Sequence, residues 1–322
     1  MSKGQHIGYI ETLRAIAACS VLAFHFICFN NGLDDIYSNE TIKSIATYGA
    51  QGVEMFYIIS GFVISLALTR SGYKIVHYGK YVLKRAIRII PVYFMVILAI
   101  SLVSVFWQSH LKLDYWNIIA NITFTVDIWE GGTWINPIFS TLGIEFQFYL
   151  LIGLLLPLFQ YRLWIKYLLL AVLIALGVRT MDHQSVLVNM PYFSLGIIMY
   201  DVYSKKFLNS SYVFLGLLLI VLLRYYYLED FITSAITLLL FLVIKPSFKL
   251  SNEIGKISYS LYLTHGFFGG WLLFFLSQER YISLSPYIII PAAFIFSLIG
   301  AKVFYILFEK PSIRLGKKIK YK

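Results

Sequence analysis

The stretch LRAIAACSVLAFHFICF, residues 13–29, decides the fold class, because it is apolar enough to lie in lipid and yet carries Arg14 and His25. The chain is 59% hydrophobic and only 13% charged, whereas soluble domains contain roughly 25% charged residues. Apolar runs long enough to cross about 30 Å of hydrocarbon recur along the chain. The sequence therefore predicts an all-α polytopic membrane protein.

The apolar runs predict about ten transmembrane helices in a single membrane-embedded domain over residues 1–322. The predicted spans are 8–29, 45–68, 89–108, 138–159, 163–178, 189–203, 211–227, 231–245, 257–276 and 287–308. A further apolar patch at 115–126 is too short to span, and it is interpreted as an interfacial or re-entrant segment or a loop.

The net charge of +11 is interpreted as a topology signal, since no RNA- or DNA-binding motif is present and no nucleic-acid partner is expected. With the amino terminus inside, most Lys and Arg residues fall in cytoplasmic loops. The basic segment 70–88 and the short basic tail 309–322 are both on that side. The outer loops contain only Lys43, Lys112, Arg179, Arg224 and Arg280. Both termini are therefore predicted to be cytoplasmic.

Arg14 and His25 are eleven residues apart, which is about three helical turns, so the two side chains share one helix face about 16 Å apart along the axis. A charged group within hydrocarbon costs at least about 2.5 kcal/mol. Arg14 is near enough to the inner end to extend toward the headgroups, and His25 is near the outer end. Their alignment on one face nevertheless favours a functional role.

Glu145 lies in the fourth predicted span at a depth similar to that of His25, near the outer third of the membrane. An outer headgroup contact would explain either residue alone. Together they suggest an oriented base, in which the carboxylate fixes the imidazole tautomer and stabilises the imidazolium.

The stretch KYVLKRAIRIIPVYF places Lys84, Arg85 and Arg88 at the start of the third predicted span. Such a run can be a topology signal that also contacts membrane lipids. It can also form a clamp for a polyanionic cytosolic cofactor, because guanidinium groups suit phosphates. Pro91 is expected either to separate the basic segment from the span or to kink the helix.

Six stretches carry a resemblance to a known family. They are LRAIAACSVLAFHF, GVEMFYIISGFVIS, KRAIRIIPVYF, TLGIEFQFYLL, ISYSLYLTH and FEKP, in this order over residues 13–311. Together they resemble the motifs of the acyltransferase 3 family. The family comprises inner-membrane enzymes that move acyl groups, commonly acetyl from acetyl-CoA, onto hydroxyls of O-antigen, exopolysaccharide and other extracytoplasmic acceptors.

The resemblance implies that Arg14 and His25 are essential, since they match the family pattern of an arginine and a histidine separated by ten residues. The Ser-Leu-x-x-Glu element of the family corresponds to Thr141, Leu142 and Glu145. Its arginine-rich motif before a proline corresponds to Lys84, Arg85, Arg88 and Pro91.

Three positions depart from the family pattern. Glu54 stands where an aspartate is common, Thr141 where a serine is common, and the LTHG sequence containing His265 replaces the frequent Trp-His-Pro. We expect these three residues to contact the acceptor, so the departures concern its identity. The C-terminal residues after FEKP are too few for a fused extracytoplasmic domain, so the membrane domain is expected to complete the transfer.

The expected function is acetyl transfer from cytosolic acetyl-CoA to an extracytoplasmic glycan or lipid-linked sugar at the bacterial inner membrane, with no metal. The residues expected to bind acetyl-CoA are Arg14, Lys84, Arg85 and Arg88, with the CoA phosphates at Arg85 and Arg88 and Arg14 as a further contact. His25 takes a proton from the acceptor hydroxyl in direct transfer, or forms an acyl-histidine. A flippase or exporter of a lipid-linked sugar and a non-catalytic scaffold are the alternatives.

Overall fold

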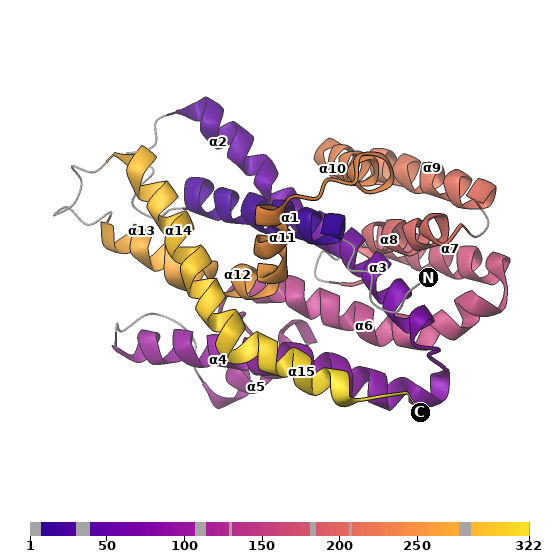
Figure 1. Ribbon diagram of the computed structural model, residues 1–322, viewed down its shortest axis with the longest axis horizontal. Helices are drawn as coiled ribbons and strands as arrows, with labels where there is room; N and C mark the ends of the chain where they lie inside the picture. The colour runs from indigo at the N-terminus through magenta and orange to yellow at the C-terminus, as the bar shows by residue number, and fades with distance from the viewer. Residues whose placement is uncertain are drawn as a thin grey trace. The chain divides into compact units, whose positions relative to one another are not determined.

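The computed structural model describes residues 8–29, 39–106, 114–128, 131–180, 185–205, 208–276 and 285–321. Every regular element in these ranges is a helix, which confirms the all-α class (Figure 1). The predicted outer-loop residues Lys112 and Arg280, and the last two residues of the predicted span 89–108, lie outside the described residues.

Seven helical segments in the described ranges are long and apolar enough to cross a membrane. They are Gly8–Cys28, Glu40–Arg70, Ile75–Val103, Ile138–Tyr161, Leu163–Thr180, Leu208–Tyr225 and Pro286–Lys318. The chain is therefore a multi-pass membrane protein. The predicted spans 189–203, 231–245 and 257–276 are also helical, but they are short or interrupted. A 14-residue helix such as Met190–Tyr203 rises only about 21 Å, so the count of ten stays a prediction.

The chain forms two compact units, the first from Met1–Ile59 and Tyr226–Ile306 and the second from Ser60–Tyr225 and Leu307–Lys322. The first unit holds helices α1 (Gly8–Cys28), α2 (Glu40–Thr47), η1 (Tyr48–Gln51), α10 (Leu228–Leu239), η4 (Leu240–Ile244), α11 (Lys249–Lys256), α12 (Ser258–His265), η5 (Gly266–Gly270), α13 (Trp271–Leu276) and α14 (Pro286–Phe304). The second holds η2 (Ile75–His77), α4 (Tyr78–Phe106), α5 (Tyr115–Thr123), η3 (Val126–Ile128), α6 (Ile138–Tyr161), α7 (Leu163–Thr180), α8 (Met190–Tyr203), α9 (Leu208–Tyr225) and α15 (Lys310–Lys318). Helices α3 (Gly52–Arg70) and η7 (Tyr305–Glu309) cross the boundary.

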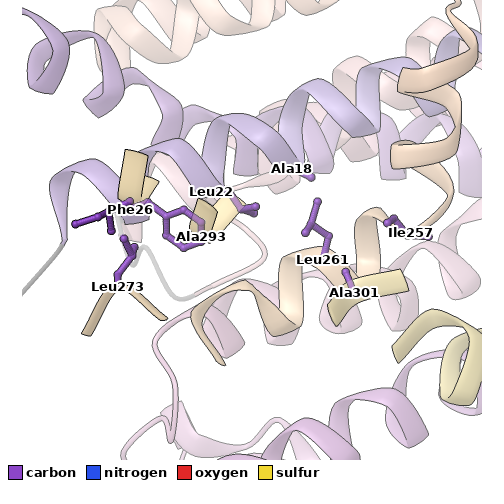
Figure 2. Close-up of a cluster of buried hydrophobic side chains, with 9 residues drawn as sticks. Ala18, Leu22, Phe26, Ile257, Leu261, Leu273, Ala293 and Ala301 are labelled. Carbon is purple, nitrogen blue, oxygen red and sulfur yellow. The ribbon is translucent and has the colours of Figure 1, made fainter. Parts of the chain in front are cut away.

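The core of the first unit forms where the apolar face of α1 meets α12, α13 and α14. Ala18, Leu22 and Phe26 recur every four residues along α1, so they share one side of that helix. Figure 2 shows these side chains with Leu261 and Leu273 in one buried cluster. This packing fixes the C-terminal half of α1, and hence His25, against α12.

Helix α4 runs without interruption from Tyr78 through Pro91 to Phe106. The expectation that Pro91 separates the basic segment from the span is therefore wrong. Neighbouring groups in a membrane bundle satisfy the carbonyl that proline leaves unpaired, so such helices tolerate the residue. The cations at 84–88 consequently lie on the same rigid helix as the apolar span.

The patch at 115–126 contains the nine-residue helix α5, which at about 1.5 Å per residue rises roughly 14 Å. Asp114 caps it by accepting a hydrogen bond from the Asn117 backbone N–H at 2.9 Å. The segment is too short to span, as expected.

Candidate active site and donor pocket

His25 and His265 are neighbours in the first unit, which the sequence did not predict. His25 lies in the last turn of α1 and His265 ends α12. Their ring centroids are 4.9 Å apart, with the ring planes inclined at 51°. His25 is half-buried, whereas His265 is fully buried. We call these two residues the histidine pair.

Each ring of the histidine pair is held by its own helix. Nδ1 of His25 lies 2.9 Å from the Val21 carbonyl oxygen, and Nδ1 of His265 lies 2.7 Å from the Tyr262 carbonyl oxygen. A carbonyl oxygen only accepts, so in the neutral rings both Nδ1 atoms carry the hydrogen. Nε2 of His265 is buried and has no hydrogen-bond partner among the described residues. The pair therefore presents two Nε2 lone pairs.

Arg14 lies on the same helix as His25, eleven residues earlier, and is half-buried. No described residue pairs with its guanidinium. At about 1.5 Å per residue the two positions are roughly 16 Å apart along the helix axis, as the sequence predicts.

Glu54, in the first turn of α3, belongs to a polar cluster with a second carboxylate. With its nitrogen turned toward both acceptors, the Gln51 amide donates to Glu54 at 3.3 Å and to Asp230 at 2.8 Å. Asp230 is buried and also accepts from the Tyr227 backbone N–H at 3.0 Å. Asp230 was not predicted from the sequence, because it lies far along the chain from Glu54.

Glu145, in the second unit, is fixed by two hydroxyl donors. Its carboxylate accepts from the Ser60 hydroxyl and, at 2.5 Å, from the Tyr149 hydroxyl one helical turn further along α6. Thr141, one turn earlier, donates to the Ile138 carbonyl at 2.8 Å. Because His25 belongs to the first unit and Glu145 to the second, the predicted contact between them stays a prediction.

The second unit contains a cavity of about 250 Å³, which we call the donor pocket. Its lining residues are Ala67, Leu68 and Ser71 from α3, Lys84, Arg85 and Arg88 from α4, Ile313, Gly316 and Lys317 from α15, and Tyr321. The three predicted cations therefore line one cavity. Lys317 adds a fourth, and these lining residues include no acidic side chain.

Arg85 is the most enclosed of the four cations, with only 8% of its surface exposed. Its guanidinium lies 5.6 Å from the ring centroid of Tyr81 and 5.4 Å from that of Tyr149. Its Nε has no hydrogen-bond partner among the described residues. Since Tyr149 also bonds Glu145, the arginine is held within an aromatic and hydrogen-bonded frame, with donor capacity left over.

Tyr321 closes one side of the donor pocket. Its ring stacks on His77, with centroids 5.7 Å apart and planes at 16°, and packs edge-on against Tyr73 at 5.8 Å. The Lys84 ammonium lies 5.2 Å from the same ring centroid. Burial raises the pKa of the Tyr321 phenol above its usual value, so the ring is neutral near pH 7. Lys317 and Tyr321 were not predicted as site residues, and the basic character of the tail was a signal for Lys317 alone.

Comparison with known families matches a model described as an acyltransferase domain to residues 7–306. This range contains every predicted site residue and ends before Lys317 and Tyr321. No curated protein and no solved structure matches the chain.

Proposed function

Because this chain belongs to the acyltransferase 3 family, we propose that it transfers an acetyl group from cytosolic acetyl-CoA to a hydroxyl of an extracytoplasmic glycan. O-antigen and exopolysaccharide are the proposed acceptors, and the bacterial inner membrane is the proposed location. The family establishes the coarser statement, that the protein is a multi-pass membrane acyltransferase.

The observation that supports acetyl-CoA as donor is the donor pocket. Lys84, Arg85, Arg88 and Lys317 line it without an acidic counter-charge. The phosphates of CoA carry about four negative charges near pH 7, since a phosphomonoester contributes about 1.5 to 2 and the diphosphate the remainder. Guanidinium forks bind phosphate oxygens in pairs, and the Nε of Arg85, to which none of the described residues is hydrogen-bonded, is available for such a bond.

The proposed chemistry takes place at His25. Because Val21 holds its Nδ1 hydrogen, Nε2 is left to accept the proton of the acceptor hydroxyl. The hydroxyl oxygen attacks the thioester carbonyl carbon, the carbon–sulfur bond breaks, and CoA leaves as the thiol after taking up the proton held by His25. In the alternative route Nε2 of His25 attacks the thioester carbon, the carbon–sulfur bond breaks and CoA leaves as the thiolate. The hydroxyl oxygen then attacks the acyl-histidine, the carbon–nitrogen bond breaks, and the hydroxyl proton passes to the CoA thiolate.

The spacing on α1 supports passage of the acyl group through the membrane domain. Arg14 and His25 are roughly 16 Å apart along the helix, a distance similar to the reach of an extended pantetheine arm. The thioester is proposed to extend along α1 to His25, and Arg14 is proposed to help bind the CoA phosphates. Glu145 is proposed to stabilise the imidazolium, while Glu54, Thr141 and His265 bind the acceptor.

The test is release of CoA thiol by purified protein supplied with acetyl-CoA and an isolated cell-surface glycan. The glycan is then examined by NMR for a new O-acetyl signal. We expect both signals with the wild-type protein and neither with His25→Ala. A flippase or scaffold would release no thiol and leave the glycan unacetylated, which would overturn the proposal.

A further inference from the structure

Helix α15 packs along α4 within the second unit (Figure 1). Gly316 lies beside Lys84, since a Cβ atom added at Gly316 would be 3.5 Å from the Lys84 carbonyl oxygen, an ordinary van der Waals distance. Ile313 and Lys317 follow one another by one helical turn, and both line the donor pocket. The C-terminal segment therefore forms one wall of the cavity, although it lies beyond the family-matched range.

Tyr321 fastens this wall to the rest of the unit. Its stacking on His77 and its contact with Tyr73 connect the end of the chain to the loop before α4. The ring also lies beneath the Lys84 ammonium. Lys317 is exposed and lines the pocket, and it directly follows Gly316, which lies beside Lys84.

If CoA enters the pocket with its pantetheine arm directed toward the apolar part of the span, its diphosphate and its 3′-phosphate lie at opposite ends of the pocket. The diphosphate adjoins the pantetheine arm, which must extend toward the apolar part of the span. Arg85 and Arg88 stand nearer that part of α4 than Lys84 does. The 3′-phosphate, which belongs to the adenosine end, then lies beside Lys84 and Lys317.

We infer that Lys317 binds the 3′-phosphate of the donor, so that the C-terminal segment selects CoA over dephospho-CoA, and that Tyr321 is a positioning residue for Lys317. This inference rests on the proposed use of acetyl-CoA. A basic tail that served only as a topology signal, or that bound lipid phosphates, would show no such selectivity.

The test compares CoA and dephospho-CoA binding to full-length protein in detergent by calorimetry. A hydrogen bond to a charged group corresponds to about 10–100-fold in affinity. We expect the wild-type protein to prefer CoA by at least about tenfold. Lys317→Gln should remove most of that preference by weakening CoA binding, while dephospho-CoA binding changes by less than about twofold. Lys318→Gln is the matched control, because Lys318 is exposed and does not line the pocket.

The positioning role is tested with two variants at residue 321. Tyr321→Phe keeps the ring contacts and should keep the preference for CoA. Tyr321→Ala loses them and should lower the preference without abolishing dephospho-CoA binding. A wild-type protein that binds neither compound would overturn the proposed donor as well. CoA binding with an unchanged preference in Lys317→Gln would overturn this inference alone.

Discussion

The histidine pair and the donor pocket are built on different principles. The orientation of each histidine is set within one turn of its own helix, by the Val21 carbonyl for His25 and by the Tyr262 carbonyl for His265. The donor pocket instead gathers cations from α4 and α15 and holds them with aromatic rings. A proton-transfer group needs one fixed tautomer, whereas a phosphate clamp needs several charges that converge from separate elements.

The largest expected effect is on the histidine pair. His25→Ala should lower acetyl transfer by about 10²–10⁴-fold, the usual contribution of a general acid–base group. CoA affinity should be unchanged, because His25 does not line the donor pocket. Transfer rates and calorimetric CoA affinities measure the two effects. Cys28→Ala, one turn further along α1, is the control and should retain the wild-type rate. A His25→Ala protein within tenfold of that rate would exclude the base role.

Glu145 tests whether the two regions act together. If it stabilises the imidazolium, Glu145→Gln should lower the transfer rate by about 10²-fold and leave CoA affinity intact. The double variant with His25→Ala should then be little worse than His25→Ala alone, since residues of one catalytic unit are non-additive. The bond from Tyr149, whose ring also contacts Arg85, offers a rival outcome. Weaker CoA binding in Glu145→Gln would assign the carboxylate to the donor pocket.

The sequence predicted the parts of the site that depend on local geometry. Helical periodicity sufficed to align Arg14 with His25, and a spacing of four residues sufficed to place Lys84 and Arg88 on one face. Both pairs lie on single helices in the structure. The tautomer of His25 depends on a carbonyl four residues earlier, so it too is a local property.

The contacts that the sequence missed join distant segments. His25 meets His265, and Lys84 meets Tyr321, only because particular helices pack together. Apolar periodicity shows which face of a helix is buried but not which partner covers it. The buried ion pair of Lys166 and Asp201, between α7 and α8, was missed for the same reason.

Substitutions at Arg85 and Arg88 distinguish a buried cation from a half-buried cation within the donor pocket. Each change to alanine should weaken CoA binding by about 10–100-fold, because each removes a charge-assisted contact. The loss at half-buried Arg88 should shrink between low and high salt, since screening weakens that contact in the wild-type protein. The loss at Arg85, which is buried between two rings, should persist. Calorimetry at two ionic strengths measures both.

Arg70→Ala is the matched control for these variants, because exposed Arg70 bonds Tyr203 at 3.5 Å and does not line the pocket. Its CoA affinity should equal that of the wild-type protein. Equal CoA affinities in all three variants would mean that the basic run is only a topology signal. Only the histidine pair would then remain as a candidate site.

The smallest expected effect is at His265, and a substitution there distinguishes the roles of the two members of the histidine pair. Its Nε2 is buried without a described partner, so it is available to accept a hydrogen bond from a second hydroxyl of the acceptor, one that does not react at His25. Such a bond contributes about 0.5–1.5 kcal/mol, or roughly 2–10-fold. His265→Gln should raise the KM for the glycan by that factor, with kcat and CoA affinity little changed. A fall in kcat as deep as that of His25→Ala would instead make His265 a second proton-transfer group, and the pair would then act as one catalytic unit.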